Sequence, residues 1–266
     1  MTLIPPVDVQ RTIDVGDRGL VLVVQDAESL ARHAAAMAFD IITDSIADRS
    51  SAFVALSGGS TPRRMGELFA NPPFSEHPFW RNTRVFWGDE RWVPLDHEES
   101  NAGVAKRVFL DSVAIPANQI HPMPVHLDSA DLAAEQYARE ISRIVPKDSG
   151  LPRFDLIFLG MGDDGHTASL FPHTAALRDQ ERLVVANVVP QLDTVRLTLT
   201  AQAINAARDV VFLIAGESKA ERLAKVLEGS VDIDTLPSQL VRPLRGQLTW
   251  VVDEAAASRL TGQART

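Results

Sequence analysis

An Asp-x-His pair that follows a strongly apolar segment is the best candidate for an acid–base centre in this sequence. Leu156-Ile157-Phe158-Leu159 runs directly into Gly160-Met161-Gly162-Asp163-Asp164-Gly165-His166-Thr167. The apolar run predicts a buried central strand, and the three glycines after it allow a sharp turn and a close approach to a ligand. A histidine titrates near neutral pH, and a neighbouring carboxylate holds its ring in one tautomer. We therefore expect His166 to serve as a base, with Asp164 as the residue that orients it.

The same loop is open to two other interpretations. It could hold a metal ion, or it could be a structural turn whose polar groups are satisfied internally. The number of metal ligands is low, because no second histidine follows at helical spacing, so no metal is expected. His173, seven residues after His166, receives no role. The other histidines are expected to be structural or to lie on the surface: His33, His77, His97, His121 and His126.

A second motif has the composition of a phosphate-binding turn. It follows an apolar segment at 52–56 and consists of Ser57, Gly58, Gly59, Ser60 and Thr61 before Pro62. Flexible glycines, hydroxyl groups and a helix N-terminus together suit a phosphate. Pro62 fits the first helical position, which predicts Thr61 or Ser60 as the cap. The motif is neither a P-loop nor a dinucleotide fingerprint, and a well-capped strand-to-helix turn would explain it equally well.

Two further motifs place a cation after a predicted strand. Arg91 stands in Trp87-Gly88-Asp89-Glu90-Arg91-Trp92, where the guanidinium could clamp a phosphate and the carboxylates could orient sugar hydroxyls. The alternative is a salt-bridge cluster at a sheet edge. Lys219 stands in Gly216-Glu217-Ser218-Lys219, at the start of a predicted helix, where a cation is unfavourable unless an anion is near. The alternative there is a lysine that extends to solvent.

Strand-like and helix-like patterns alternate along the chain and predict the elements that position these motifs. The expected strands are 20–24, 52–56, 84–87, 156–160, 183–189, 195–200, 210–215 and 248–252, and the expected helices are 26–48, 102–111, 129–145, 219–228 and one that starts at Pro62. Such alternation predicts an α/β fold with three layers, in which a mostly parallel sheet is flanked by helices. The carboxyl ends of parallel strands share one edge, so the four motifs are expected to converge there.

The remaining segments are expected to be connections or short elements. A short helix is expected near Thr167 and a final helix from Glu254, whereas 71–82 and 118–128 are expected to be surface excursions. The connections are short and no Gly/Ser-rich linker divides the chain, so one domain spanning residues 1–266 is expected.

Composition excludes several classes of protein. The formal net charge of −9 argues against a general nucleic-acid binder, although local cations can still bind a small anion. No apolar run approaches the ~20 residues that cross a bilayer, and 1–11 contains no apolar signal region. The chain has no cysteine, which excludes disulfides and thiolate catalysis. We expect a cytoplasmic protein with a small-molecule substrate and no obligate protein partner, nucleic acid or membrane.

Taken in order, these motifs resemble the 6-phosphogluconolactonase family, which belongs with the glucosamine-6-phosphate isomerase/deaminase-like proteins. The resemblance covers roughly residues 20–252. The residues that carry it are Leu56-Ser57-Gly58-Gly59-Ser60-Thr61-Pro62, Gly88-Asp89-Glu90-Arg91, Ser100-Asn101, Gly160-Met161-Gly162-Asp163-Asp164-Gly165-His166-Thr167-Ala168-Ser169-Leu170-Phe171-Pro172 and Gly216-Glu217-Ser218-Lys219-Ala220. The block from Gly160 to Pro172 is the most specific of them.

The resemblance implies a modified Rossmann-like fold of the isomerase/deaminase type. It also implies hydrolysis of 6-phospho-D-glucono-1,5-lactone to 6-phospho-D-gluconate, the second step of the oxidative pentose phosphate pathway, without a metal or another cofactor. In this resemblance His166 is the base, and the 57–61 turn, Arg91 and Lys219 line the sugar-phosphate site.

Two other functions were weighed against lactone hydrolysis. The deaminase branch has a glutamate shortly after its Asp-Gly-His motif, whereas Ala168-Ser169-Leu170-Phe171-Pro172 contains no acid. Amine release would therefore lack a proton-transfer group, while lactone hydrolysis needs only an activated water. A sugar-phosphate-sensing regulatory domain would normally carry a DNA-binding or partner module, and the segment before the first strand is too short to be one.

Overall fold

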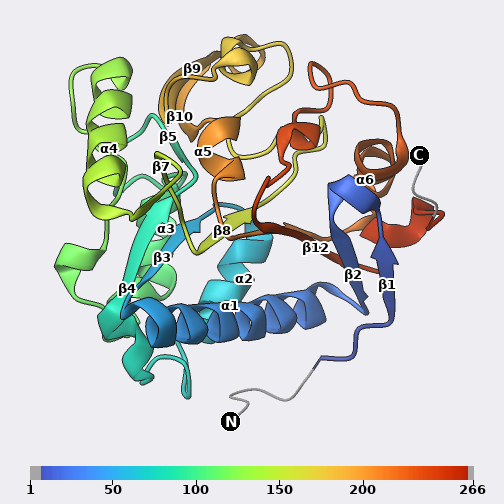
Figure 1. Ribbon diagram of the computed structural model, residues 1–266, viewed down its shortest axis with the longest axis horizontal. Helices are drawn as coiled ribbons and strands as arrows, with labels where there is room; N and C mark the ends of the chain where they lie inside the picture. Colours follow the sequence, from blue (N-terminus) through green and yellow to red (C-terminus); the bar gives the residue numbers. More distant parts are fainter. Residues whose placement is uncertain (1–6, 263–266) are drawn as a thin grey trace.

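A seven-stranded sheet runs through the middle of the molecule within residues 7–262, which are the part of the chain that the computed structural model describes (Figure 1). Its strands lie in the order β1 (Arg11–Asp14), β2 (Leu20–Val24), β12 (Gln247–Asp253), β11 (Asp209–Ile214), β8 (Leu156–Leu159), β3 (Ala52–Leu56) and β4 (Thr83–Trp87). Only β1 pairs antiparallel with its neighbour; every other pair in this sheet is parallel. The prediction of a mostly parallel sheet is confirmed.

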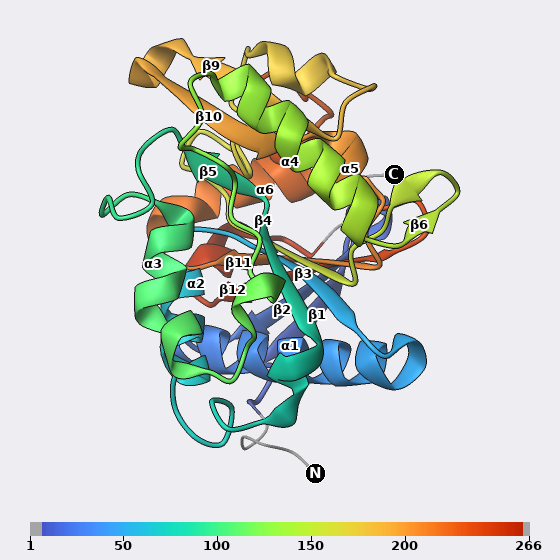
Figure 2. The ribbon, with the colours of Figure 1, turned by 90° about the vertical axis from the view of Figure 1, so that its left-hand side faces the viewer.

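Helices cover both faces of this sheet, which gives three layers (Figure 2). The α-helices are α1 (Ala27–Arg49), α2 (Ser60–Phe69), α3 (Asn101–Val108), α4 (Ala130–Ile144), α5 (Ala201–Asn205) and α6 (Ala220–Glu228). Helices α1, α2 and α3 contribute to one apolar cluster, and α4, α5 and α6 contribute to the other. Strand β8 supplies Leu156 and Phe158 to the first cluster and Ile157 and Leu159 to the second. Because successive side chains point to opposite faces, a strand covered on both sides must be apolar throughout.

A smaller antiparallel sheet stands above the carboxyl ends of the main strands. It contains β5 (Asp89–Arg91), β10 (Thr194–Leu199) and β9 (Val184–Val189), in that order. The Gly88 peptide joins the two sheets, because its N–H donates to Leu56 O at 2.8 Å and its carbonyl accepts from Leu199 N at 2.8 Å. The chain therefore leaves the main sheet at Gly88 and enters the small one. This change of sheet places Arg91 directly opposite Arg196.

The order of the strands creates a switch point between β3 and β8. From β3 the chain continues to β4 on one side, whereas from β8 it continues to β11 and β12 on the other. The two strands share only the pairs Val54↔Leu156 and Ala55↔Ile157. Open α/β sheets bind ligands beyond the carboxyl ends of their strands at such a point. The 57–61 turn follows β3, and the loop that contains His166 follows β8.

Several local predictions were wrong. No helix forms near Thr167, which instead makes an isolated bridge with Leu170, and the final helix is only a 3-10 turn at Ala256–Arg259. The expected loop after α4 contains a short hairpin of β6 (Lys147–Asp148) and β7 (Leu151–Pro152), and α3 ends three residues earlier than expected.

The two expected surface excursions contain buried side chains. Phe74, Phe79 and Trp80 are buried, and the rings of Phe74 and Phe79 contact Phe39 of α1 edge-on. Met123 in the second excursion is fully buried. Prolines in these segments indicated irregular backbone, but irregular backbone can still cover a core with large apolar side chains. Within residues 7–262, no helix is both long and apolar enough to span a bilayer.

We expect Tyr137→Phe to lower the free energy of unfolding by about 1–3 kcal/mol. The fully buried Tyr137 oxygen of α4 accepts the N–H of Trp87, the last residue of β4, at 2.8 Å. Its loss leaves that amide without a partner in the core. Urea denaturation measures the effect, and Gln136→Ala, an exposed change on the same helix, should stay within about 0.5 kcal/mol. Equal stability of the two variants would contradict this expectation.

Candidate active site

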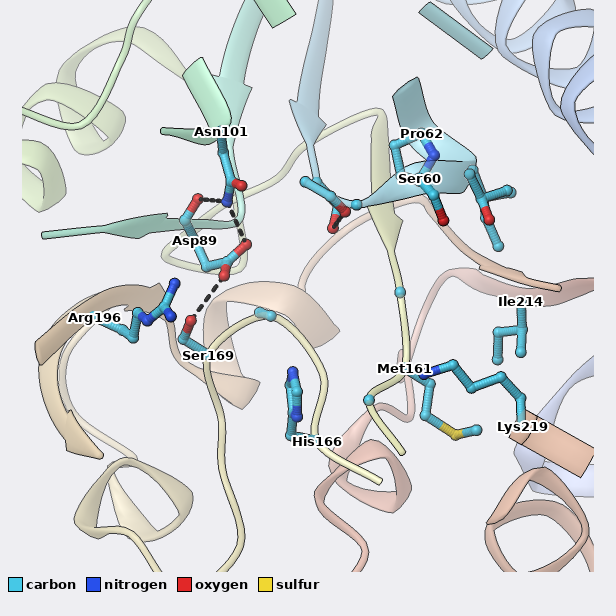
Figure 3. A pocket seen from close by; sticks show the side chains of 18 of the residues that line it. Ser60, Pro62, Asp89, Asn101, Met161, His166, Ser169, Arg196, Ile214 and Lys219 are labelled. Carbon is cyan, nitrogen blue, oxygen red and sulfur yellow. Dashed lines mark hydrogen bonds between the residues drawn. The ribbon is translucent and has the colours of Figure 1, made fainter. Parts of the chain in front are cut away.

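A cavity of about 240 Å³ opens at the carboxyl ends of β3, β8 and β11 (Figure 3). Its lining includes every site residue expected from the sequence except Asp164: Ser57, Gly58, Gly59, Ser60, Thr61, Arg91, His166 and Lys219. Asp164 lies behind His166 and contacts it directly. The structure thus brings together residues from four loops that are far apart in the chain.

The Asp164–His166 pair has the geometry of an oriented base. His166 Nδ1 lies 2.6 Å from Asp164 Oδ1, and the same oxygen accepts the His166 backbone N–H at 3.1 Å. Burial acts to raise the pKa of Asp164, but the hydrogen bonds and charge of His166 outweigh it and hold that pKa below its usual value. The carboxylate is therefore ionised at neutral pH, so Nδ1 carries the proton. Nε2 is left with its lone pair for substrate chemistry.

Two neighbours fix the plane of this imidazole. Phe171 stacks on it with ring centroids 4.0 Å apart and an interplanar angle of 27°. Gly162 passes so close that a Cβ atom there would overlap both the His166 ring and the Asp164 carboxylate. Gly162 is thus required for packing, since the dyad lies against its backbone, which has no side chain.

The loop that carries the dyad is held from both ends. Gly162 N donates to His166 O at 2.9 Å, and the Thr167 hydroxyl donates to Gly160 O at 2.9 Å. From the segment before β12, the fully buried Ser238 donates its hydroxyl to Gly165 O at 2.8 Å. Residues before and after the histidine therefore have fixed main-chain partners. Sequence reasoning gave no role to Ser238.

The 57–61 turn presents an uncapped helix N-terminus to the cavity. The N-cap of α2 is Gly59, with φ of 111°, and not Thr61 or Ser60 as expected. A glycine takes this conformation without strain, and it has no side chain to satisfy the first amides of the helix. Ser60 and Thr61 therefore lie inside the first turn. The free amides and the helix dipole favour an anion at this position.

Two arginines face the cavity from neighbouring strands of the small sheet. Arg91 of β5 and Arg196 of β10 are cross-strand partners, and the Nε atom of each is buried without a hydrogen bond in the described part of the chain. Burial and the charge of Arg91 lower the pKa of Arg196. Two cations held together in this way would be stabilised by an anion. Arg196 was missed because its only sequence signal is its place in an expected strand.

The carboxylates of the Asp89-Glu90-Arg91 motif have different roles. Asp89 lines the cavity, where it accepts the Ser169 hydroxyl at 2.7 Å and Asn101 Nδ2 at 3.2 Å (Figure 3). Glu90 is fully buried and accepts the first amides of α3, from Asn101 at 2.7 Å and Ala102 at 2.8 Å. Burial raises the pKa of Glu90, against the effect of these hydrogen bonds. Within the described residues, no ion pair joins either carboxylate to Arg91, so the expected alternative of a salt-bridge cluster is wrong.

The two adjacent aspartates of the glycine loop have different partners. Asp164 bonds His166, whereas Asp163 Oδ1 lies 2.6 Å from Lys219 Nζ. Lys219 lines the cavity, so it does not simply extend into solvent. Among residues 7–262, no group of three or more histidine and carboxylate side chains could hold a metal ion. His121 is structural, as expected: it bonds Glu140 at 2.8 Å and stacks on Phe86.

These features agree with what comparison with known proteins finds. The family of glucosamine-6-phosphate isomerases/6-phosphogluconolactonase matches residues 25–250, and the chain belongs to this family. A 6-phosphogluconolactonase from Synechocystis sp. is 43% identical over 221 residues, which cover 82% of this chain and 89% of that protein. One from Nostoc sp. is 41% identical over 209 residues, which cover 78% and 84%.

The fold of the family is also confirmed at the level of structure. The solved structure of 6-phosphogluconolactonase from Trypanosoma cruzi superposes with a TM-score of 0.80 at 27% identity, and the match covers 95% of this chain and all of that one. The expected three-layer α/β fold is therefore shared with a solved member.

We expect Gly162→Ala to lower kcat/KM for 6-phosphogluconolactone by at least about 100-fold. The change would displace the Asp164–His166 dyad, and a displacement of about 1 Å at a catalytic group has an effect of this size. The added methyl group cannot fit unless the dyad moves. Gly160→Ala is the matched control, because a Cβ atom at that glycine meets nothing within 4 Å; it should lose less than about tenfold. Circular dichroism checks that both variants fold. Similar activity of the two variants would show that the contact is unimportant.

Proposed function

We propose that the chain hydrolyses 6-phospho-D-glucono-1,5-lactone to 6-phospho-D-gluconate by attack of a water that His166 activates. The chain is an enzyme of the lactone hydrolase class, as its curated relatives are. The observation that carries the mechanism is the meeting of the Asp164–His166 dyad with three cations in one cavity. A base and an anion-binding site so close together suit a phosphorylated ester.

The substrate phosphate is assigned to this cavity, whose lining includes three cations and the N-terminus of α2. A phosphate monoester carries about −1.5 to −2 charges at neutral pH. The free amides of the 57–61 turn, Lys219, Arg91 and Arg196 supply donors and charge for it. Arg196 is added here to the expected set because it lies opposite Arg91 and its Nε has no partner in the described residues.

His166 acts as a base and then as an acid. Its Nε2 takes a proton from water as the water oxygen forms a bond to C1 of the lactone. The tetrahedral oxyanion is stabilised by nearby N–H donors. The candidates are the Arg91 guanidinium and amides of the glycine loop other than those of Gly162, Gly165 and His166, which already have acceptors. When the bond from C1 to the ring oxygen breaks, the imidazolium returns the proton to that oxygen. Asp164 stabilises the imidazolium throughout.

Phe171 supports hydrolysis over deamination. It occupies the acid-free stretch after the histidine and covers one face of the imidazole at 4.0 Å. Ring opening of an amino sugar and release of its amine would need a proton-transfer group there, and an apolar ring supplies none. Water attack on an ester needs only the base that is already present.

We propose that the chain works as a single domain in the cytoplasm, with the lactone as its small-molecule partner. The mechanism above uses only side chains and amides of this chain. It calls for no nucleic acid, membrane or second protein.

His166→Ala should lower kcat/KM for the lactone by about 10²–10⁴-fold, which is the usual contribution of a positioned general base. The assay uses freshly generated 6-phosphogluconolactone and subtracts its spontaneous hydrolysis. His126→Ala, which removes an exposed histidine, is the control and should retain full activity. Wild-type rates in a folded His166→Ala protein would overturn the assignment of the base.

Arg196→Ala, Arg91→Ala and Lys219→Ala should each raise KM for the phosphorylated lactone by about tenfold or more, since a hydrogen bond to a charged group contributes about 1.5–3 kcal/mol. The Arg196→Ala and Lys219→Ala variants should turn over unphosphorylated gluconolactone as the wild type does, so the discrimination between the two substrates falls. Arg91→Ala also removes a candidate oxyanion donor and should slow both substrates, the phosphorylated one more. Arg139→Ala, an exposed arginine on α4, is the control. If discrimination stays unchanged in all three variants, the phosphate lies elsewhere.

A further inference from the structure

One of the three cations in the cavity already has a carboxylate partner. Lys219 Nζ lies 2.6 Å from Asp163 Oδ1, whereas within the described residues no carboxylate lies within ion-pair distance of Arg91 or Arg196. The side chain of Asp163 is 75% exposed and that of Lys219 is 23% exposed. The lysine thus faces the cavity while its charge is balanced from the solvent side.

The carboxylate of Asp163 is not needed to hold its own loop. The backbone carbonyl of Asp163 accepts Arg222 Nε of α6 at 3.0 Å, and the loop is further held by the bonds between Gly162 and His166. Among residues 7–262, Lys219 is the only ion-pair partner of this side chain. A surface ion pair contributes only about 0.2–1 kcal/mol to the free energy of unfolding, so the pair of Asp163 and Lys219 adds little to the stability of the protein.

We propose that Asp163 is a competing counter-ion that weakens the hold of Lys219 on phosphate and so sets the affinity for substrate and product. This inference rests on the assignment of the phosphate to the cavity made above. When a phosphate binds Lys219, the Asp163 carboxylate must either move away from the lysine or stay close to the phosphate, whose negative charge repels it. Both outcomes oppose binding, and both disappear when the carboxylate is neutralised.

A positioning role for Asp163 makes the opposite prediction. If the carboxylate served to hold the lysine in a productive place, its loss would weaken phosphate binding. The exposure of Asp163 favours competition, because an exposed side chain that is free to turn is a poor support for a neighbouring one. The sign of the effect therefore separates the two roles.

The test is calorimetric titration of the whole protein with 6-phosphogluconate and, separately, with inorganic phosphate. Asp163→Asn keeps the shape of the side chain and removes its charge, and it should bind both probes about two- to fivefold more tightly, which is the upper part of the range that corresponds to a surface ion pair. Glu217→Gln is the matched control, because it removes an exposed charge two residues from Lys219 that makes no recorded ion pair with it. It should change affinity by less than about 1.5-fold.

A double-mutant cycle then shows whether the effect passes through the lysine. In a Lys219→Ala background, Asp163→Asn should no longer tighten binding. Weaker or equal binding by the single Asp163→Asn variant would overturn the proposal, as would an equal gain in the Glu217→Gln variant or in the Lys219→Ala background.

The lactonase assay keeps this inference separate from the proposed function. Suppose that Asp163→Asn binds both probes more tightly than the wild type and Glu217→Gln, but the wild type does not hydrolyse the lactone. This result would contradict the proposed function and leave the proposed competition by Asp163 intact. If the wild type hydrolyses the lactone but Asp163→Asn does not change the affinity for either probe, the function stands and the competition is rejected. Absence of any binding by the wild type would reject the phosphate site and the competition together.

Discussion

The hydrogen bond between Asp164 and His166 is the interaction on which the rest of the site depends. It requires main chain without a side chain at Gly162, because any Cβ atom there would occupy the space of the imidazole. It also requires a loop that returns on itself, which the bond from Gly162 N to His166 O at 2.9 Å closes. The switch point between β3 and β8 supplies the open edge above which such a loop can stand.

Around this dyad, several polar groups lack partners in the unliganded protein, which lowers its stability but favours the binding of a ligand. The N-terminus of α2 has no side-chain cap, and the buried Nε atoms of the cross-strand partners Arg91 and Arg196 have no partner within residues 7–262. An uncapped helix and unpaired polar groups each cost free energy in the unliganded protein. Three other helix N-termini have side-chain partners: Asp26 caps α1, Ser129 caps α4, and Glu90 binds the first amides of α3 from a neighbouring strand. In the cavity, an anionic ligand would complete the free amides of α2 and these two Nε atoms.

The sequence allowed the architecture and most of the cavity lining to be predicted, because both depend on local patterns. Strand β3 was predicted with its observed bounds. Arg196 and Ser238 could not be found in this way, because they reach the site through pairing with distant segments. The prediction of Thr61 or Ser60 as the N-cap of α2 was wrong. Serine and threonine are favoured as caps because their side chains bind the first amides of the helix. A helix that binds an anion has no such need.

The acid-free stretch after the histidine has a structural counterpart in the position of Phe171. From the sequence, the stretch indicated only that a proton-transfer group is missing. In the structure the same stretch packs an aromatic ring against the His166 imidazole, with centroids 4.0 Å apart. The ring covers one face of His166 and restricts its rotation, while Asp164 bonds Nδ1. In the proposed mechanism Nε2 of His166 is the base, and an apolar ring beside it adds no second proton acceptor, as a carboxylate would. In that mechanism the residue at this position couples the packing of the loop to the choice between ester hydrolysis and amine release.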